Sequence, residues 1–304
     1  MNKMNLSPVI ALLDSALRLG TPIALTAIGE LIAEKSGVVN IGIEGIMVIG
    51  AFASVVATYA TGDPIIGVLV GVAIGALLGF LHGTLSTYLY ADQIIVGMGI
   101  IFFGYGITAV GNAIIWGQPG FSVGVSTISH LVVRVGEASV SISPIFFLTI
   151  VLAILTYFVL KYTWVGLRLR SVGEDPEVAD VLGINVFRLR LYATVVGGAL
   201  TGLAGAYLGV DWGGRFVSYM SAGRGFIALA AIIVGGWEPL ITLLASYLFG
   251  FFDALQLTLA QLYGKQVPPQ LFQMIPYIAT VVVFALFFRK ARPPAAIARP
   301  YRRE

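Results

Sequence analysis

Long apolar stretches, separated by short polar turns, follow one another along the chain of 304 residues. An α-helix needs about 20 mainly apolar residues to cross the hydrocarbon core of a bilayer, and most of the stretches approach or exceed that length. The pattern predicts an all-α polytopic membrane protein with about eight to ten transmembrane helices in one transmembrane domain, residues 1–304. The stretches cover residues 20–34, 41–61, 65–90, 93–117, 143–161, 191–210, 224–236, 239–260 and 271–289.

Two of the stretches depart from a simple span. The stretch 224–236 is short and closes on two glycines, which predicts a broken or half-crossing helix, since irregular backbone at membrane depth needs protein or water around it. Before residue 20 the apolar run is interrupted by Asp14 and Arg18. We expect that segment to be retained as an interfacial helix leading into the first span, because a cleaved signal peptide has a cleaner apolar core.

Composition supports a membrane protein and excludes several kinds of chemistry. Hydrophobic residues make up 58% of the chain and charged residues 11%, whereas a soluble domain has about 25% charged residues. Cysteine is absent, which excludes disulfides, thiol catalysis and cysteine metal sites. The net charge of +3 reflects where basic residues gather and does not indicate nucleic-acid binding.

Basic residues concentrate in, and directly before, the loop 162–190 and the tail 290–304. Lysine and arginine mark the cytoplasmic side of membrane proteins, so both regions, and the C-terminus with them, are predicted to be cytoplasmic. Four predicted spans separate the two regions, an even number, as a shared side requires. The residues are Lys161, Arg168, Arg170, Arg188, Arg190, Arg289, Lys290, Arg292, Arg299, Arg302 and Arg303.

Two segments resemble each other at an offset of 175 residues. "DPIIGVLVGVAIG", from Asp63, and "EPLITLLASYLFG", from Glu238, both begin with an acid and a proline and end on a glycine. The predicted topology runs them in opposite directions, as in the inverted repeats of transporters. Chance similarity stays open, because acid-proline helix starts are common.

Glycine recurs every fourth residue in the third stretch. Five glycines in register leave one face of a helix bare, which predicts close packing against another helix. A substrate path lined by glycine is the alternative. The glycines are Gly67, Gly71, Gly75, Gly79 and Gly83.

The sequence offers no catalytic or metal-binding constellation. The two histidines, His82 and His130, have no carboxylate three or four residues onward. Phosphate-gripping, zinc-protease and nucleophile-elbow motifs are all missing. We therefore expect no enzyme activity, no cofactor and no metal, and any ATP must be hydrolysed by another chain.

A few polar residues interrupt the apolar stretches. Asn40 and Glu44 share a helix face at the entry of a span, where they can either clamp a broken helix or line a translocation path. Asn112 is a further candidate for the path. Glu34 and Lys35 are expected to be solvated at a turn. The spans carry few charges, which favours a neutral solute.

The most charged segment between two spans is Ser171 to Arg190. An N-cap aspartate, a proline after it and a glycine stop predict a two-turn helix over 174–183. Its apolar residues fall at i, i+3 and i+4 and form a stripe that can bury against a second protein. Its acids would orient that contact, and the flanking arginines would mainly set topology. The segment comprises Glu174, Asp175, Pro176, Glu177, Val178, Ala179, Asp180, Val181, Leu182 and Gly183.

Three blocks carry a resemblance to a known family. "GELIAEKSGVVNIGIEGIMVIGAF", "LRLRSVGEDPEVADVLGINVFRLR" and "GRGFIALAAIIVGGWEP" resemble, in the same order, the permease subunits of nucleoside ABC importers, within the ribose and branched-chain amino acid permease superfamily. The resemblance implies that the helix at 174–183 is the coupling helix, which docks in a groove of a cytosolic ATPase.

The resemblance further implies a set of partners in the cell membrane. They are cytosolic ATP-binding subunits that hold ATP and magnesium, a second permease subunit, an extracellular or periplasmic substrate-binding lipoprotein and a small neutral solute, with membrane lipid around the assembly. Permeation of simple sugars or branched-chain amino acids stays open, since relatives handle them. A stand-alone secondary transporter is the alternative from another class, and the sparse intramembrane charge speaks against it.

Overall fold

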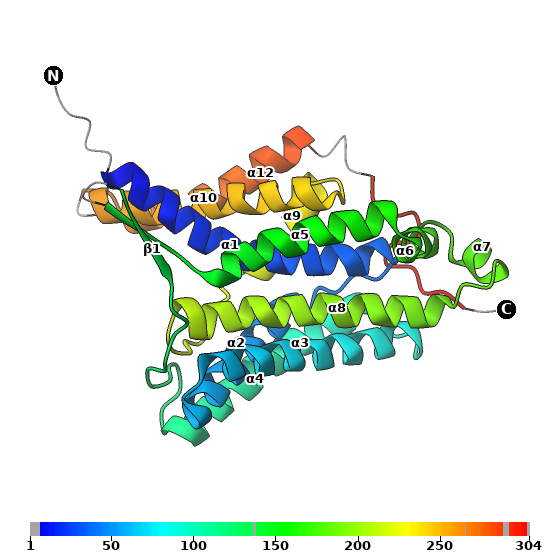
Figure 1. Ribbon diagram of the computed structural model, residues 1–304, viewed down its shortest axis with the longest axis horizontal. Coiled ribbons are helices and arrows are strands. Elements are labelled where there is room, and N and C mark those ends of the chain that lie inside the picture. The colour runs from blue at the N-terminus through cyan, green and yellow to red at the C-terminus, as the bar shows by residue number, and fades with distance from the viewer. Residues whose placement is uncertain (1–6, 136–137, 265, 288–291, 303–304) are drawn as a thin grey trace.

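The computed structural model describes residues 7–135, 138–264, 266–287 and 292–302. It is a bundle whose long helices run roughly along one common direction (Figure 1). Seven helices in the described ranges are long and apolar enough to cross a membrane. They are α1 (Ser7–Lys35), α2 (Ile43–Thr61), α3 (Pro64–Thr87), α4 (Gln93–Trp116), α5 (Pro144–Tyr162), α8 (Val186–Ala206, continued by a π-helical turn, Tyr207–Trp212) and α10 (Pro239–Tyr263).

Shorter elements complete the chain. The remaining elements are β1 (Leu131–Val135), β2 (Ala138–Ile142), α6 (Trp164–Glu174), α7 (Pro176–Val181), α9 (Arg224–Val234), α11 (Pro269–Gln273) and α12 (Ile275–Phe287). The antiparallel pair β1–β2 lies at one end of the bundle, the hairpin end, and α6 and α7 lie at the other, the α7 end (Figure 1).

Seven of the nine predicted spans are long helices, and the all-α fold is confirmed. The stretch 224–236 forms the short helix α9, and the described part of the stretch 271–289 is divided between α11 and α12. The expected interfacial helix before residue 20 is wrong: α1 runs unbroken from Ser7 to Lys35. Asp14 and Arg18 do not break it, because they pair with each other at 2.8 Å and Asp14 also accepts a hydrogen bond from the Ser141 amide at 3.0 Å. Residues 1–6 lie outside the described residues.

The repeated segments begin α3 and α10, whose first residues lie at opposite ends of the bundle (Figure 1). Asp63 and Glu238 are the two N-cap residues, and each is followed by proline at the start of its helix. The opposite directions agree with an inverted repeat. A common origin of the two halves stays a prediction.

The regularly spaced glycines of α3 bring its backbone against two neighbouring helices. A Cβ atom on Gly75 would lie 2.6 Å from the Gly202 Cα of α8, so no side chain fits between these helices. A Cβ on Gly67 would lie 2.6 Å from the Ser54 carbonyl of α2. The three others that face α8 in the same way are Gly71, Gly79 and Gly83.

Two segments inside the bundle have an irregular backbone, one before α9 and one between α1 and α2. α9 has 11 residues and is about 16 Å long, roughly half the hydrocarbon thickness. The irregular segment 213–223 before it starts near the hairpin end, where Ser122 and Phe216 are hydrogen-bonded. Between α1 and α2, residues 36–42 are likewise irregular and buried or half-buried.

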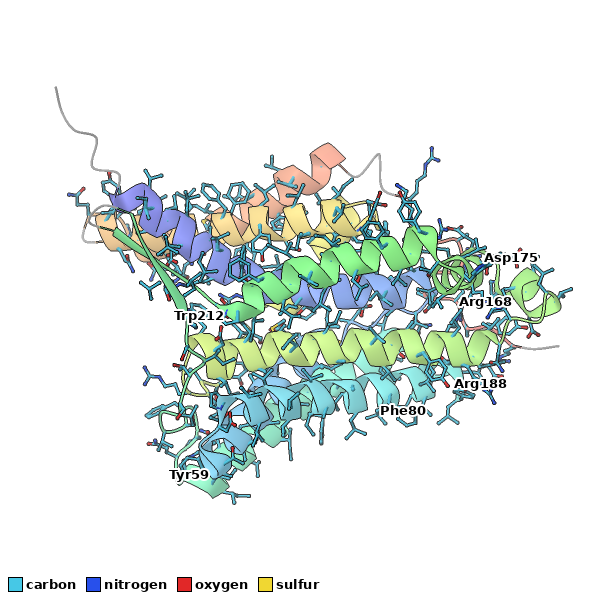
Figure 2. The ribbon with its side chains drawn as sticks, in the orientation of Figure 1. Tyr59, Phe80, Arg168, Asp175, Arg188 and Trp212 are labelled. Carbon is cyan, nitrogen blue, oxygen red and sulfur yellow. The ribbon has the colours of Figure 1, made fainter. Side chains whose placement is uncertain are left out.

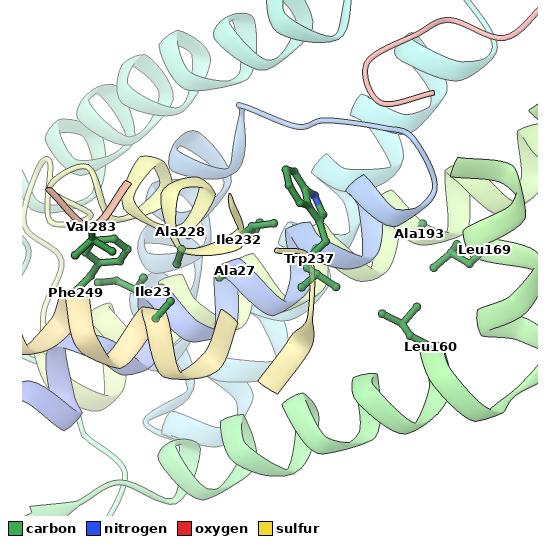
Figure 3. Packing of buried hydrophobic residues seen from close by; sticks show 13 residues of the cluster. Ile23, Ala27, Leu160, Leu169, Ala193, Ala228, Ile232, Trp237, Phe249 and Val283 are labelled. Carbon is green, nitrogen blue, oxygen red and sulfur yellow. The ribbon is translucent and has the colours of Figure 1, made fainter. Parts of the chain in front are cut away.

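The largest apolar cluster joins the two halves of the chain. Residues of α1 and α5 pack there against Trp237 and residues of α9, α10 and α12 (Figure 3). The cluster fixes α9 beside α1. Its labelled members include Ile23, Ala27, Ala228, Ile232 and Phe249.

Candidate functional site

The helix predicted in the central loop is α7, at the end of the bundle (Figures 1 and 2). The Asp175 carboxylate caps it by accepting a hydrogen bond from the Val178 amide at 3.0 Å. Pro176 occupies the first turn, where a missing N–H costs nothing. Gly183 ends the segment with φ of +82°, which side chains with a Cβ rarely adopt.

One face of α7 is open to the outside. Val178, Val181 and Leu182 have relative exposures of 54%, 88% and 73%. The opposite face is closed, since Ala179 is buried in a small apolar cluster that includes Tyr301. An exposed stripe on a firmly seated short helix is the geometry that helix-in-groove docking uses.

The two acids of α7 differ in their surroundings. Glu177 is exposed. Asp180 is half-buried, and its carboxylate accepts a hydrogen bond from the Tyr301 hydroxyl at 2.9 Å. A shared orienting role for both acids is therefore not what the geometry favours: Asp180 anchors α7 to its own chain.

Residues 292–302 of the predicted basic tail pack across the α7 end. The Ala296 amide donates to the Gly173 carbonyl at 2.9 Å, and the Ala298 amide donates to the Gly37 carbonyl at 3.0 Å. This segment therefore joins the connection between α1 and α2 to the last turn of α6, directly before α7. Residues 290, 291, 303 and 304 of the tail lie outside the described residues.

Arg190 corrects the expectation that the flanking arginines serve mainly topology. Its side chain is 1% exposed and donates to the Ser36 carbonyl at 3.1 Å and to the Arg299 carbonyl at 2.9 Å. In α8, Arg190 falls on the same face as the buried residues Val186 and Thr194.

Glu34 is not solvated, contrary to the expectation for this turn. It is buried, and its carboxylate accepts a hydrogen bond from the indole N–H of Trp237. Trp237 lies more than 200 residues away along the chain, so the covering of Glu34 is a tertiary effect. Lys35 beside it stays half-exposed.

Asn40 holds the irregular connection between α1 and α2. Its amide N–H donates to the Glu30 carboxylate at 2.6 Å, and its Oδ1 atom accepts from the Gly42 amide at 2.9 Å. Nearby, the Val39 amide donates to the Gln93 Oε1 at 2.8 Å. Side chains thus satisfy backbone groups that a continuous helix would have paired internally.

Glu44 joins the start of α2 to the start of α9. Its carboxylate accepts hydrogen bonds from the Ser221 hydroxyl at 2.5 Å, the Gly223 amide at 2.9 Å and the Gly225 amide at 2.7 Å. These amides belong to the N-terminus of α9, where unpaired N–H groups and the helix dipole favour a negative charge. The arrangement is that of a polar clamp, and a role in the translocation path stays a prediction.

Replacing Glu44 with alanine should lower the free energy of unfolding by about 3 kcal/mol or more, because each buried donor left unpaired costs about 1–3 kcal/mol. Thermal unfolding of the purified protein measures the change. Glu177→Ala removes an exposed acid and should stay within about 0.5 kcal/mol of the wild type. Equal changes in the two variants would contradict the clamp.

Asn112, the third path candidate, lies apart from this clamp. Its amide nitrogen donates to the Gln118 carbonyl at 3.0 Å, beyond the end of α4. No hydrogen bond among the described residues connects it with Asn40 or Glu44. Its place in a path stays a prediction.

The described residues contain no group of three or more histidines, aspartates or glutamates arranged to hold a metal ion. His82 is buried, with its Nε2 atom 3.1 Å from the Val39 carbonyl, so it supports the same irregular connection. His130 contacts Asp211 of α8 at 3.1 Å and Ser141 of β2 at 3.0 Å, and joins the hairpin to the bundle.

Comparison with known proteins agrees with these features. The nucleoside ABC transporter permease protein NupC of Lactococcus lactis subsp. cremoris is 38% identical, over 97% of both chains. The guanosine ABC transporter permease protein NupQ of Bacillus subtilis is 33% identical, over 92% of both. A putative glucose ABC transporter permease protein of Haloferax volcanii is 32% identical, over 96% of this chain and 98% of the other.

A solved structure shares the fold. An inward-facing putative metal-chelate type ABC transporter matches with a TM-score of 0.52 at 16% identity, over 95% of this chain and 91% of that one. The family described as "Branched-chain amino acid transport system / permease component" matches residues 12–285. The chain belongs to this family and is the permease subunit of an ABC importer, with ATP hydrolysis on a separate subunit.

Proposed function

We propose that the imported solute is a nucleoside. The observation that supports this most directly is the 38% identity to a nucleoside permease over 97% of both chains, together with the 33% identity to a guanosine permease. The sparse charge of the long spans suits an uncharged solute of this kind. A sugar is the second candidate, since a putative glucose permease is 32% identical over nearly the same length.

The α7 end is the cytoplasmic end in this proposal, and α7 is the coupling helix. The exposed stripe of Val178, Val181 and Leu182 enters a groove of the ATPase subunit, with Glu177 at the edge of the contact. A second permease subunit completes the path, and an extracellular substrate-binding protein delivers the solute to the hairpin end.

Movement of the ATPase groove would be transmitted to the permease through the contacts of α7 with its own chain. α6 and α8 flank α7, and the segment 292–302 joins the last turn of α6 to the connection between α1 and α2. ATP binding that closes the two ATPase subunits would therefore move α7 together with the ends of α5 and α8. This movement exposes the path alternately to the two sides of the membrane.

Competition for uptake tests the solute. In the assembled complex, an excess of unlabelled nucleoside should reduce uptake of labelled guanosine at least tenfold, while ribose, glucose and leucine should leave it unchanged. The same complex without its ATPase subunits provides the background. Competition by glucose and not by nucleosides would overturn the nucleoside assignment.

A further inference from the structure

A hollow lies between α5 and α8 near the α7 end. It has a volume of about 280 Å³, and its walls are almost entirely apolar. α5 contributes Leu152 and Val159, α6 contributes Leu169, and α8 contributes Val196 and Leu200. The hollow is thus an apolar groove along two membrane-crossing helices.

A second, larger hollow of about 700 Å³ continues from the first. Leu189 and Tyr192 line both, so the two form one groove. The second hollow has a polar wall, to which Arg168 of α6 and Arg188 of α8 contribute. Figure 2 shows the two arginines at the same end of the molecule, Arg168 on α6 and Arg188 on α8.

The second hollow is the mouth of the groove. Among the described residues, the guanidinium groups of Arg168 and Arg188 at this mouth have no carboxylate partner. The ion pairs among the described residues involve Arg18, His130 and Arg224, not Arg168 or Arg188. Two like charges that face one hollow repel each other unless an anion lies between them. Their contrast with the buried and hydrogen-bonded Arg190 shows that these two cations are left available.

α6, which borders the mouth, has the features of a helix at a membrane surface. Figure 1 shows α6 nearly end-on, so it runs across the direction of α5 and α8. Trp164 and Val165 at its start are largely exposed apolar residues, and Arg168 follows within one turn. An amphipathic helix that lies across a bundle end, with an aromatic residue and basic residues, is typical of the headgroup region.

We propose that this groove binds an anionic phospholipid of the bilayer. An acyl chain lies in the apolar hollow along α5 and α8, and the phosphate lies between Arg168 and Arg188 at the mouth. The charge pattern selects the occupant: a neutral chain alone would leave both cations unpaired, and a free phosphate would leave the apolar hollow unfilled. Basic pockets between membrane helices bind anionic headgroups in this way.

The lipid would also touch the coupling segment. Gly183 and Asn185 line the mouth of the groove and belong to the connection from α7 to α8. A bound headgroup therefore braces this connection from the membrane side. This consequence for coupling rests on the proposed function of α7, whereas lipid binding itself does not depend on it or on the solute.

Lipid retention tests the proposal in the complete transporter. The complex is purified from nanodiscs of phosphatidylcholine with a minor fraction of phosphatidylglycerol, and native mass spectrometry counts the lipids that remain bound. We expect preferential retention of phosphatidylglycerol. Arg168→Gln should weaken it on the order of fivefold, and Arg168→Gln with Arg188→Gln about 30-fold.

A second readout uses the groove itself. Brominated phosphatidylglycerol should quench the fluorescence of Trp164. Val196→Phe, which narrows the hollow and adds no tryptophan, should displace the lipid without removing a charge. Arg170→Gln is the matched control, because Arg170 lies on the same helix but lines a different hollow with Lys35. This control should retain the lipid as the wild type does.

Three results would overturn the proposal. Equal retention of the two lipids would show that charge does not select the occupant. Equal loss in Arg170→Gln and Arg168→Gln would reduce the effect to net charge. Displacement of the lipid by inorganic phosphate would assign the arginines to a free anion. Absence of the lipid from the complex, when the permease alone retains it, would assign them to an acidic surface of the ATPase.

Discussion

Replacing both Val181 and Leu182 with aspartate is expected to abolish solute uptake and the ATPase activity that depends on it. The two side chains are the most exposed apolar residues of α7, at 88% and 73%. In the proposed docking they are buried in the ATPase groove, where two unpaired carboxylates cost several kcal/mol. Uptake and ATP hydrolysis are measured in reconstituted complexes.

The folded state should be unaffected, since both side chains are largely exposed. Size-exclusion chromatography and thermal unfolding check this point. Val181→Ile with Leu182→Met is the matched control: it changes the same two positions and keeps the stripe apolar. Undiminished coupling in the double variant would rule out docking through the stripe.

Replacing Gly75 with leucine is expected to prevent accumulation of folded protein. The added Cβ atom would lie 2.6 Å from the Gly202 Cα and 2.8 Å from its amide nitrogen, which are backbone atoms and cannot rotate away. Gly75→Ala is the milder change and should cost about 1–3 kcal/mol, the usual range for overpacking. Yield of monodisperse protein and its thermal unfolding midpoint measure both.

Gly106 of α4 provides the control, because the same change from glycine to alanine is made there at an open position. A Cβ atom there meets nothing within 4 Å. Gly106→Ala gains the same helix propensity as Gly75→Ala, so it should be neutral or slightly stabilising. If the two alanine variants unfolded at the same temperature, close contact between α3 and α8 would not explain the glycine pattern.

The spans could be predicted because a membrane helix satisfies its backbone hydrogen bonds locally, so length and hydropathy identify it. The short stretch at 224–236 could also be recognised as incomplete. Its position in the bundle could not, because Glu44 binds the start of α9 from a position about 180 residues earlier. The position of Glu44 at the entry of a span marked it as unusual in the sequence, but no pattern identified the start of α9 as its partner.

The misplaced residues share one physical cause. Glu34 and Arg190 are charged residues near the predicted end of a span, where solvation is the usual outcome. Both are buried by segments from the last third of the chain, Trp237 for the first and residues 296–299 for the second. No local pattern carries such information, because the covering segment is itself irregular and short.

The segment 292–302 has a consequence for biosynthesis. Asp180 and its partner Tyr301 are 121 residues apart, so the ribosome makes α8, α9, α10 and α12 before the contact beneath α7 can form. A nascent permease that stalls during insertion therefore presents α7 on an unfinished base. An ATPase subunit that recognises α7 only when Tyr301 holds it in place would not bind such a chain. ATP would then be hydrolysed only by transporters whose permease is completely synthesised.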